Sequence, residues 1–536
     1  MNPRALLTWT LAGALALLGL GLADLLLVDR TLLTPYSESH PASEPRRHPA
    51  TGLLHVEDLQ TGEAFTLLPG NRVAYLDPAT GRVDPEKDAS AIRLGQGKIV
   101  RRHEPLSPLY AFFVPLRADH RPRLLFALAL CALVLLVVPR LERIPHAGWL
   151  LLLPVLAVLV RAAFAWIRQP LGEIGSQLLL YENEELLFDV PRVGSLRSFL
   201  DDYAGNMRNA SLHGSHFPPG YILLLKGIAL VAGHSSQAAI EDHVALYGWS
   251  LLVLGATALV PLYLLARDLS GARAARFGAA LFLFAPNSIA FGAVSLDAVF
   301  CAAALWTIWA FRRAVDVGSA TLAAVGGVLL GLTTFLSFSG LVLGLFLALL
   351  FVLGWRDVPL RRRIVPLACF AGGAGLFVAV LDVAFGFDFV ACLRNARVLE
   401  AALMEQAAAQ RGTSLVALRG YLVWANLGAF FLGSGLALLG PWLLAVRDAV
   451  RALRSRASSL AAFTLALLGV LLAGATIYHM ETERIWLYLT AGIAISVGGL
   501  LAAAAPHARA ERMLRLVAGS LALQAAASEA LLFTLW

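Results

Sequence analysis

Charge is scarce in this sequence. Asp, Glu, Lys and Arg together make up 15% of its 536 residues, whereas hydrophobic residues make up 58%. The apolar share is well above that of a soluble globular chain, so an ordinary water-soluble fold is excluded. The sequence therefore predicts a polytopic membrane protein, a chain that crosses the bilayer several times.

Cysteine is also scarce, and the apolar blocks lack any alternation of apolar with polar residues. Three of the four cysteines, Cys131, Cys301 and Cys369, lie inside apolar blocks, and Cys392 lies in a predicted loop. This distribution implies no disulfide framework. The strands of a closed membrane barrel alternate in polarity, so the unbroken blocks exclude a barrel and favour helices.

A basic surface on one soluble face is missing too. The formal net charge is +7, but the arginines occur in short loops between the apolar blocks. Such loops indicate membrane topology, and no nucleic-acid partner is expected.

What the sequence does contain is a series of apolar blocks of about 15 to 25 residues, the length with which a helix crosses a bilayer. A first helix is expected within residues 1–28, because its apolar run exceeds the core of a usual signal peptide; Gly21 and Ala23 leave a cleaved signal peptide as the alternative. Later spans are predicted at 123–139, 148–166, 243–266, 277–290, 297–311, 319–335, 338–355, 364–385, 416–445, 459–477, 486–503 and 514–533. The fold class expected is an all-α polytopic membrane protein of about thirteen transmembrane helices.

Residues 29–122 differ from the rest of the chain, because they are polar and punctuated by turn residues. The stretches "HVEDLQTGEAFTLL" and "RVAYLDPATGRVDP" each read as two short strands around a turn. We therefore predict a small β-rich external domain at 29–122, between the N-terminal helix at 1–28 and a polytopic membrane domain at 123–536.

The basic loops predict the orientation of the membrane domain. Six of them are expected on the cytoplasmic side by the positive-inside rule: 139–143, 266–276, 311–313, 355–363, 446–456 and 506–515. This assignment is consistent only if residues 219–233 do not cross the bilayer. The leucine run of "HGSHFPPGYILLL" is therefore expected to lie at the membrane surface, at the rim of a cavity. The segment 167–242 becomes the longest external loop of the membrane domain.

The external loop 167–242 is rich in acidic residues and histidines. Glu185 and Asp189 are four residues apart, which on a helix places both carboxylates on one face. In a partly dry site one of them could act as a general base. A solvated acidic surface is the alternative interpretation.

Two histidines and two prolines follow in the same loop. His213 and His216 are three residues apart, a spacing compatible with a shared metal or with binding of a phosphate, whereas simple exposure is the alternative. Pro218 and Pro219 fix the backbone before the apolar run. Gly220 permits close approach of a ligand or of another segment.

A second candidate site lies at 478–489, the predicted external mouth of a late span. Glu481, Glu483 and Arg484 precede an aromatic and leucine run. Arg484 could extend to lipid headgroups, or its planar guanidinium could bind the phosphate of a lipid-linked substrate.

Ionisable residues inside the spans are a third signal. Arg161, Asp297 and Asp382 all fall toward the predicted outer ends of their helices. Charges within a membrane usually mark function or pairing, and these gather on one side. An outward-facing site is therefore expected.

Together these motifs resemble the GT-C superfamily of integral membrane glycosyltransferases. The likeness is to the bacterial family-39-type enzymes, relatives of protein O-mannosyltransferases and of the lipid A aminoarabinose transferase. It rests on "SHFPPGYILLL" (215–225), "FAPNSIAFGAVSLDAVF" (284–300) and "ETERIWLYL" (481–489), and it covers about residues 148–503. The chain departs from the family pattern, because an extra helix and the β-rich insert precede the first family helix.

The resemblance implies transfer of a sugar from a polyprenyl-phosphate carrier to an acceptor hydroxyl. The acceptor would be a lipid, glycan or protein, and the site would face the periplasm or the exterior from the cell (inner) membrane. The resemblance implies that a carboxylate of the first large external loop acts as base, and several acidic residues compete for this role. Our hypothesis gives the role to Asp189, oriented by Glu185, and has Arg484 with His213 or His216 stabilise the donor phosphate. Supporting residues are Glu481, Glu483, Pro218, Pro219 and Asp297. No cofactor is certain, since the carboxylates and histidines could hold a divalent metal but some relatives of the fold need none.

Two other classes of function remain as alternatives. In a multispan transporter or flippase, Arg161, Asp297 and Asp382 would line a translocation path, although the sequence shows no internal repeat and these charges gather at one rim. In an envelope assembly or sensor protein, the 29–122 domain would do the work.

Overall fold

The structure is a computed structural model, and it describes most of the chain between residues 36 and 534. The residues outside the description are 1–7, 9–35, 48, 50–53, 61, 69–71, 78–91, 96–97, 104–110, 114–115, 117, 138–143, 180–185, 355–358, 411–412, 455–458, 478–481, 505–506 and 535–536. The predicted first helix at 1–28 therefore lies outside the described residues, apart from Thr8.

The chain divides into two compact units, Val28–Phe113 and a larger unit formed by Met1–Leu27 and Val114–Trp536. The smaller unit contains a seven-stranded antiparallel sheet in the order β1-β7-β6-β5-β4-β3-β2. Its strands are β1 (Tyr36–Pro41), β2 (Arg46–Arg47), β3 (Leu54–Glu57), β4 (Ala64–Leu68), β5 (Arg72–Leu76), β6 (Ile92–Gly95) and β7 (Lys98–His103); β8 (Ala111–Phe113) follows.

The small sheet is built from the expected turn chemistry. Strands β3 and β4 pair with Val56 opposite Phe65, and Gly62 between them has a positive φ of 73°. Val56, Phe65 and Ile99 form its buried apolar cluster. His40 of β1 has its Nδ1 2.8 Å from Oδ2 of Asp58, the residue after β3, and both side chains are buried.

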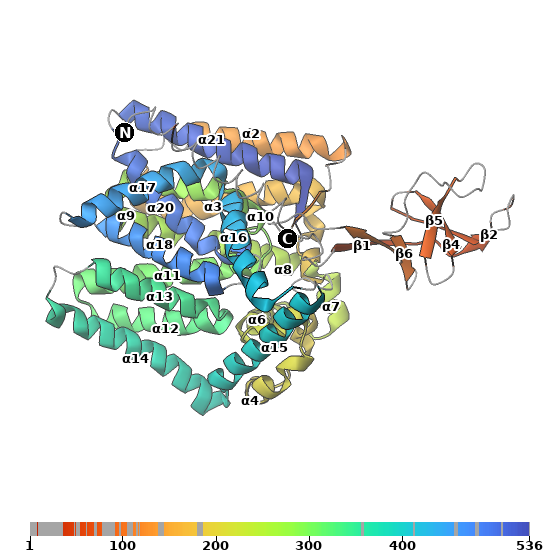
Figure 1. Ribbon diagram of the computed structural model, residues 1–536, viewed down its shortest axis with the longest axis horizontal. Coiled ribbons are helices and arrows are strands. Elements are labelled where there is room, and N and C mark those ends of the chain that lie inside the picture. Colours follow the sequence, from red (N-terminus) through yellow and green to blue (C-terminus); the bar gives the residue numbers. More distant parts are fainter. Residues whose placement is uncertain are drawn as a thin grey trace. The chain divides into compact units, whose positions relative to one another are not determined.

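The larger unit is helical, and in Figure 1 most of its long helices run side by side. Its long helices are α2 (Arg121–Val137), α3 (His146–Arg168), α8 (Val244–Ala256), α9 (Leu259–Phe284), α11 (Leu296–Val317), α12 (Ala320–Leu336), α13 (Ser339–Gly354), α14 (Leu360–Phe385), α15 (Phe389–Gln410), α16 (Leu415–Ser434), α17 (Leu436–Arg454), α18 (Ser459–Ile477), α20 (Leu487–Ala502) and α21 (His507–Leu531). Shorter elements are η2 (Ala118–His120), η4 (Leu171–Glu173), η5 (Ser176–Leu179), η6 (Leu186–Phe188), η7 (Val190–Arg192), α4 (Leu196–Asn206), η8 (Met207–Asn209), α5 (Leu212–His216), α6 (Gly220–Ala232), α7 (Gln237–Asp242), α10 (Pro286–Ala290), α19 (Thr482–Ile485) and the strand β9 (Leu532–Thr534).

Within the described residues, seven helical segments are long and apolar enough to cross a membrane, and four apolar helices are shorter. The seven are Ala118–Val137, His146–Arg168, Val244–Phe284, Leu296–Val317, Arg363–Phe385, Leu415–Ser434 and Ser459–Ile477. The all-α membrane fold is thereby confirmed, whereas the predicted number of thirteen spans is not matched one for one.

Three of the predicted spans are the shorter apolar helices α12, α13 and α20, and breaks in the helices change two further predictions. The segment Val244–Phe284 holds two predicted spans, and Gly271 interrupts it with a φ of 87°. The predicted span 416–445 is instead two helices, because Gly435 separates α16 from α17 with a φ of 106°. In Figure 1, α16 crosses the direction of the neighbouring helices.

The break at Gly435 is held by the last helix. The side-chain amide of Gln524 in α21 donates from Nε2 to the Leu432 carbonyl at 2.8 Å. Its Oε1 accepts from the Leu436 backbone N–H, also at 2.8 Å. One side chain therefore satisfies backbone groups on both sides of the break, as a buried helix end requires.

Glycine lets the helices of the larger unit approach closely. The strongest contacts are between α12 and α14 and between α9 and α20. At the first, a Cβ on Gly327 would overlap the Phe370 carbonyl; at the second, a Cβ on Gly498 would lie against Gly278. Small residues at such contacts are typical of helix packing in membranes.

The segment "HGSHFPPGYILLL" forms α5 and the start of α6. Helix α6 has 13 residues, about 20 Å at 1.5 Å per residue, which is shorter than a bilayer core. Gly220 at its first position packs against the backbone of Phe335 and Leu336, where a Cβ would overlap the Phe335 carbonyl oxygen. The close approach expected of Gly220 is therefore made by α12.

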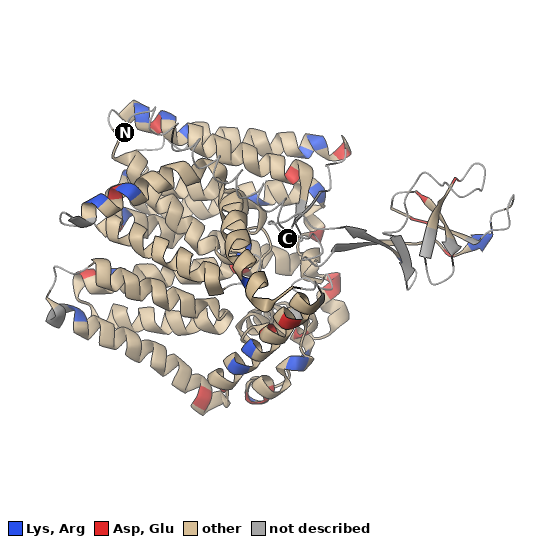
Figure 2. Cartoon of the chain, viewed as in Figure 1, with Lys and Arg blue, Asp and Glu red and all other residues tan. Residues whose placement is uncertain are grey.

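Figure 2 shows charged residues mainly at the ends of the long helices, with uncharged residues between.

Candidate functional site

The turn between α9 and α11, residues 286–297, gathers polar side chains from several distant helices. It comprises α10 and the residues that lead into α11, and it contains much of the motif "FAPNSIAFGAVSLDAVF". Pro286 begins α10 at a position where a missing N–H costs nothing. Ser295 ends the turn, because its hydroxyl caps α11 by accepting from the Asp297 N–H at 3.1 Å.

A buried ion pair joins this turn to the late external motif. Arg484 Nη1 lies 3.2 Å from Asp297 Oδ2, and the two residues are 2% and 8% exposed. The Ser295 hydroxyl donates to Asp297 Oδ2 at 3.1 Å. Two residues singled out independently in the sequence therefore lie in direct contact.

Helix α19, which carries Arg484, is anchored to α16. The buried Thr482 hydroxyl donates to the Asn426 carbonyl at 2.7 Å. The Asn426 amide in turn donates to the Ala475 carbonyl of α18 at 3.5 Å. These bonds fix the short helix that presents the guanidinium.

Asn287 makes a second connection from the same turn. Its side-chain amide donates to the Thr490 hydroxyl at 2.8 Å, and Ser434 lies 2.7 Å from the same hydroxyl. All three side chains are buried. The turn is thus joined to α20 and α16 by a short polar chain.

Arg161 of α3 makes a third connection. Its Nη2 donates to the Ser288 hydroxyl at 3.1 Å, and the residue is 1% exposed. A Cβ on Gly292 would overlap the Arg161 guanidinium. Only glycine therefore leaves room for this guanidinium against the turn.

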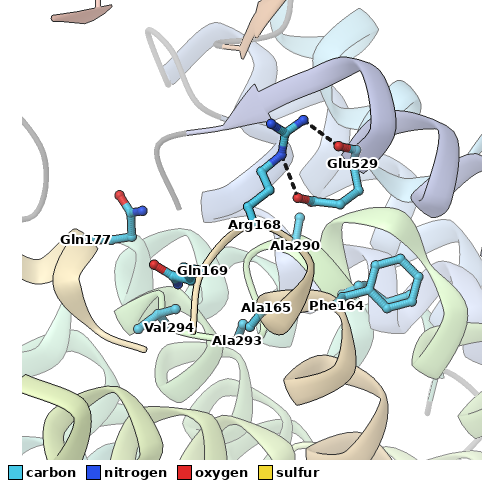
Figure 3. A pocket seen from close by; sticks show the side chains of 10 residues that line it. Phe164, Ala165, Arg168, Gln169, Gln177, Ala290, Ala293, Val294 and Glu529 are labelled. Atoms are coloured by element: carbon cyan, nitrogen blue, oxygen red, sulfur yellow. Dashed lines mark hydrogen bonds and ion pairs between the residues drawn. The ribbon is translucent and has the colours of Figure 1, made fainter. Parts of the chain in front are cut away.

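A cavity of about 140 Å³ opens beside the turn (Figure 3). Its wall includes Ile289, Ala290, Ala293 and Val294 of the turn. The remaining wall comes from the end of α3, the loop that follows it and α21: Phe164, Ala165, Arg168, Gln169, Gln177 and Glu529.

An ion pair closes one side of the cavity. Arg168 Nε donates to Glu529 Oε1 at 2.9 Å, and its Nη2 donates to the Leu532 carbonyl at 2.9 Å. Gln169 Oε1 accepts from the Ser176 hydroxyl at 3.1 Å. The cavity therefore combines an apolar wall with a few oriented polar groups, as ligand pockets do.

Asp189 is held within the segment 167–242 rather than at the cavity. Its carboxylate accepts from the Ser211 N–H at 3.0 Å and from the Ser211 hydroxyl at 2.6 Å. Arg192 Nη1 lies 3.0 Å from Asp189 Oδ1. With 2% exposure, Asp189 fastens η7 to the turn before α5.

The side chains of three predicted site residues, Glu185, Glu481 and Glu483, lie outside the description of the structure. Glu185 and Glu481 lie outside the described residues, and for Glu483 only the backbone is described, in α19. The helical face expected for Glu185 and Asp189 is absent from the described part, because 186–192 forms two short 3-10 turns that meet at Asp189.

His213 and His216 lie on α5, next to the buried pair Pro218 and Pro219. The His213 ring stacks on Phe217 at 5.9 Å, and His216 Nδ1 lies 2.9 Å from the Ser215 hydroxyl. Pro219 is the N-cap of α6.

Tyr203 fixes this proline turn. Its hydroxyl donates to the carbonyls of Gly214 and Phe217, at 2.7 and 3.1 Å. Burial raises the pKa of Tyr203 well above its usual value. The hydroxyl therefore remains a hydrogen-bond donor.

The cavity pair Arg168 and Glu529 was not among the candidates expected from the sequence. Both are ionisable residues at the ends of apolar blocks, the signal that singled out Arg161 and Asp297. Within the described part of the chain, no group of three or more His, Cys, Asp or Glu side chains is placed to hold a metal ion.

No family model matches this sequence, and no curated protein matches it. Solved structures do. The apo oligosaccharyltransferase of Archaeoglobus fulgidus aligns with a TM-score of 0.46 and 14% identity over 72% of this chain and 56% of its own. The same protein, AglB, in complex with an inhibitory peptide and a dolichol-phosphate aligns with a TM-score of 0.44 and 14% identity over 71% and 56%.

The arabinosyltransferase EmbB of Mycobacterium smegmatis aligns with a TM-score of 0.35 and 14% identity, over 93% of this chain and 53% of its own. The chain spans about half the length of the solved structures it matches. With TM-scores below 0.5, the alignments describe a partial likeness of fold and carry no weight in assigning an activity.

Proposed function

We propose that this chain is a membrane glycosyltransferase of the GT-C type. It moves a sugar from a polyprenyl-phosphate-linked donor to an acceptor hydroxyl on the outer face of the cell (inner) membrane. The observation that carries the proposal is the buried ion pair between Arg484 of α19 and Asp297, the last residue of the turn whose residues 289, 290, 293 and 294 line the cavity. A guanidinium held in a water-poor site suits a phosphate leaving group, because its fork of N–H groups matches phosphate oxygens.

The outer face is supported by where the charged candidate residues lie on their helices. Arg161 and Arg168 are in the second half of α3, whose start follows the basic loop 139–143. Asp297 lies in the first turn of α11, and the basic residues at 311–313, predicted to form a loop, lie within the same helix toward its far end. Each candidate thus lies at the opposite end of its helix from the loop expected in the cytoplasm.

The reaction follows from these groups. The acceptor hydroxyl oxygen attacks the anomeric carbon, the bond from that carbon to the phosphate oxygen breaks, and the hydroxyl proton passes to a carboxylate. Charge develops on the leaving phosphate, where Arg484 would stabilise it and Asp297 would hold Arg484 in place. A preorganised donor of this kind contributes on the order of 10²-fold to 10³-fold in rate.

The base has two candidates in the external loop. Asp189, assigned by the resemblance, is buried and already bonded to Ser211 and Arg192. Glu173 is exposed in η4, between the cavity residues Gln169 and Gln177. An accessible carboxylate in the segment that joins two cavity residues suits proton abstraction better than a buried one, so we rank Glu173 first and treat Asp189 as a positioning residue. A divalent metal, if one takes part, would be held by loop carboxylates, and EDTA would then stop transfer.

Transfer of radiolabelled sugar from a polyprenyl phosphate in proteoliposomes tests the function. We expect Arg484→Gln to lower turnover on the order of 10²-fold. The double variant Arg484→Gln with Asp297→Asn should stay equally slow while restoring stability, because no buried charge is left unpaired. Arg312→Gln is the matched control: Arg312 is also buried and pairs with Asp316 at 3.0 Å, at the other end of α11.

The same assay separates the two carboxylates. Glu173→Gln should abolish transfer with folding intact, whereas Asp189→Asn should lower the unfolding temperature. Wild-type turnover in Arg484→Gln would sink the assignment of the phosphate site. Substrate counterflow across the membrane without any sugar transfer would support the transporter or flippase alternative instead.

A further inference from the structure

The start of α21 carries exposed arginines without an acidic partner. Arg509 and Arg512 are both exposed, and within the described part of the chain neither guanidinium takes part in an ion pair or a hydrogen bond. Glu511, the acidic residue between them, pairs with Arg515 at 3.3 Å. The two positive charges are therefore open to an anion from outside the chain.

The break in α9 brings a third arginine to the same place. Arg273, two residues after Gly271, donates from Nη2 to the His507 carbonyl at 3.0 Å, and its Nη1 bonds the Nδ1 of the same residue. His507 begins α21 and lies 234 residues from Arg273 in the sequence. Packing therefore adds the charge of Arg273 to the arginines of α21.

One face of α21 changes from basic to apolar. Arg509, Leu516 and Leu523 follow one another at intervals of seven residues, and Arg512 precedes Leu516 by four, so all four lie along one side of the helix. Leu516 and Leu523 are each 63% exposed. At 1.5 Å per residue, the arginines lie about 6 to 10 Å beyond Leu516. This face therefore has the profile of half a bilayer, with charge at the head groups and leucine in the hydrocarbon.

Helix α2 extends the apolar part of this face. The two helices lie side by side in Figure 1, and a Cβ on Gly519 of α21 would lie 3.9 Å from the Leu135 side chain of α2. Leu133 and Leu136 of α2 are 57% and 50% exposed. They belong to Ala118–Val137, one of the segments apolar enough to cross a membrane. Exposed leucines on two adjacent helices provide a surface for acyl chains.

We propose that the arginines at the start of α21, with the exposed leucines of α21 and α2, form a binding surface for an anionic phospholipid. The phosphate lies at Arg509 and Arg512, because guanidinium groups donate to phosphate oxygens, and the acyl chains follow the leucines. Basic clusters at the membrane end of a helix bind anionic lipids in this way. A zwitterionic lipid is disfavoured, because its head group adds a cation beside the arginines.

The surface is distinct from the cavity and does not rest on the proposed function. The cavity residue Glu529 follows Arg509 by 20 residues of α21, about 30 Å along the helix. The loop 506–515 is also expected in the cytoplasm, whereas the sugar donor is proposed on the outer face. The lipid bound here is therefore a membrane component that holds α21, not the sugar donor.

Native mass spectrometry of the full-length protein in detergent tests the surface, with dioleoyl phosphatidylglycerol and dioleoyl phosphatidylcholine as the two lipids. Wild type should bind phosphatidylglycerol more tightly. Arg509→Gln with Arg512→Gln should weaken that binding on the order of 10-fold to 30-fold, the range for two basic residues at an anionic surface, and leave phosphatidylcholine binding unchanged. Arg509→Lys with Arg512→Lys keeps both charges and should lose no more than a few-fold.

A matched control removes the same charge elsewhere. Arg313→Gln with Arg397→Gln replaces two exposed arginines, on α11 and α15, and should bind both lipids like wild type. An equal loss of phosphatidylglycerol binding in this control would show that binding follows net charge alone and would overturn the site.

The remaining outcomes also decide the proposal. Equal affinity of wild type for the two lipids would overturn it, as would unchanged phosphatidylglycerol binding in the double glutamine variant. Glycerol 3-phosphate, an anionic head group without chains, is the third probe, and binding as tight as that of phosphatidylglycerol would assign the arginines to a soluble phosphate instead. Should the double glutamine variant not fold, each single glutamine variant should still weaken phosphatidylglycerol binding several-fold.

Discussion

Arg484 and Asp297 are both buried, and their attraction alone does not guarantee that the pair stabilises the folded protein. Desolvation of a buried pair offsets much of its Coulomb energy unless further hydrogen bonds hold the geometry. Ser295 provides one such bond to Asp297, and Thr482 anchors the helix that carries Arg484. The pair is therefore better understood as a device that positions a cation than as a source of stability.

Cys392 offers a test of burial at a single residue outside the candidate spans. It is fully buried in α15, and burial, with a smaller effect of Asp388, raises the pKa of its thiol to about 12. The folded protein therefore keeps the thiol protonated at pH 8. We expect maleimide to label Cys392 only after unfolding, as measured by mass spectrometry of the labelled peptide.

The raised pKa of Cys392 also makes the stability of the folded protein depend on pH. An unfolded thiol ionises near its ordinary pKa of 9.0, while the folded one resists ionisation up to about 12. The contribution of Cys392 is thus complete below pH 9 and is lost as the pH rises through this window. Rapid labelling of the folded protein at pH 8 would contradict the burial of this residue.

The sequence could nominate single residues but not their partners. Arg161 and Asp297 stand out because a charge in an apolar block is rare, and Arg484 stands out because it directly precedes an aromatic and leucine run. Their connections through one turn depend on how distant helices pack. The cavity residues Ala290 and Ala293 carry no chemical signal at all, because a wall-forming alanine looks like any other alanine.

At the scale of elements, the start of α6 depends on Gly220 and its contact with the α12 backbone. Gly220→Ala should force the two helices apart and lower stability by about 1–3 kcal/mol, as overpacking does. Gly227 in the same helix has open space at its Cβ position, so Gly227→Ala should be neutral or stabilising by up to about 1 kcal/mol. Thermal unfolding in detergent measures both.

Equal unfolding temperatures for the two alanine variants would show that α6 does not rest on α12. That α6 does not span could be foreseen, because the basic loops are consistent only if residues 219–233 do not cross the bilayer. Its partner could not, since nothing in "GYILLL" identifies residues 335 and 336.

At the scale of the whole molecule, the orientation in the membrane can be tested with one matched pair of cysteines. Ser235 lies exposed after α6, and Ser270 lies exposed beside the break at Gly271. In a cysteine-free background, a membrane-impermeant maleimide should label Ser235→Cys on intact cells. Ser270→Cys should react only after the membrane is opened. Labelling of Ser270→Cys from outside would reverse the assignment of the basic loops.

The helical membrane fold was predictable from the sequence because apolar length and basic loops are strong, local signals. The breaks in the helices were less predictable from the sequence. Gly271 and Gly435 have left-handed or extended positive-φ conformations, yet they are two of 46 glycines. Which glycine bends a span is decided by the neighbouring helices.

The bend at Gly435 also has a consequence for the order in which the protein is made. Gln524 bonds the backbone on both sides of the bend, but it follows Leu436 by 88 residues in the chain. Because chains leave the ribosome from the N-terminus, α16 and α17 are synthesised some time before Gln524, the residue that joins them. During that interval the Leu432 carbonyl and the Leu436 N–H must form hydrogen bonds with water or with another protein. The shape of this bend is therefore a late event in biogenesis, completed only when the last helix arrives.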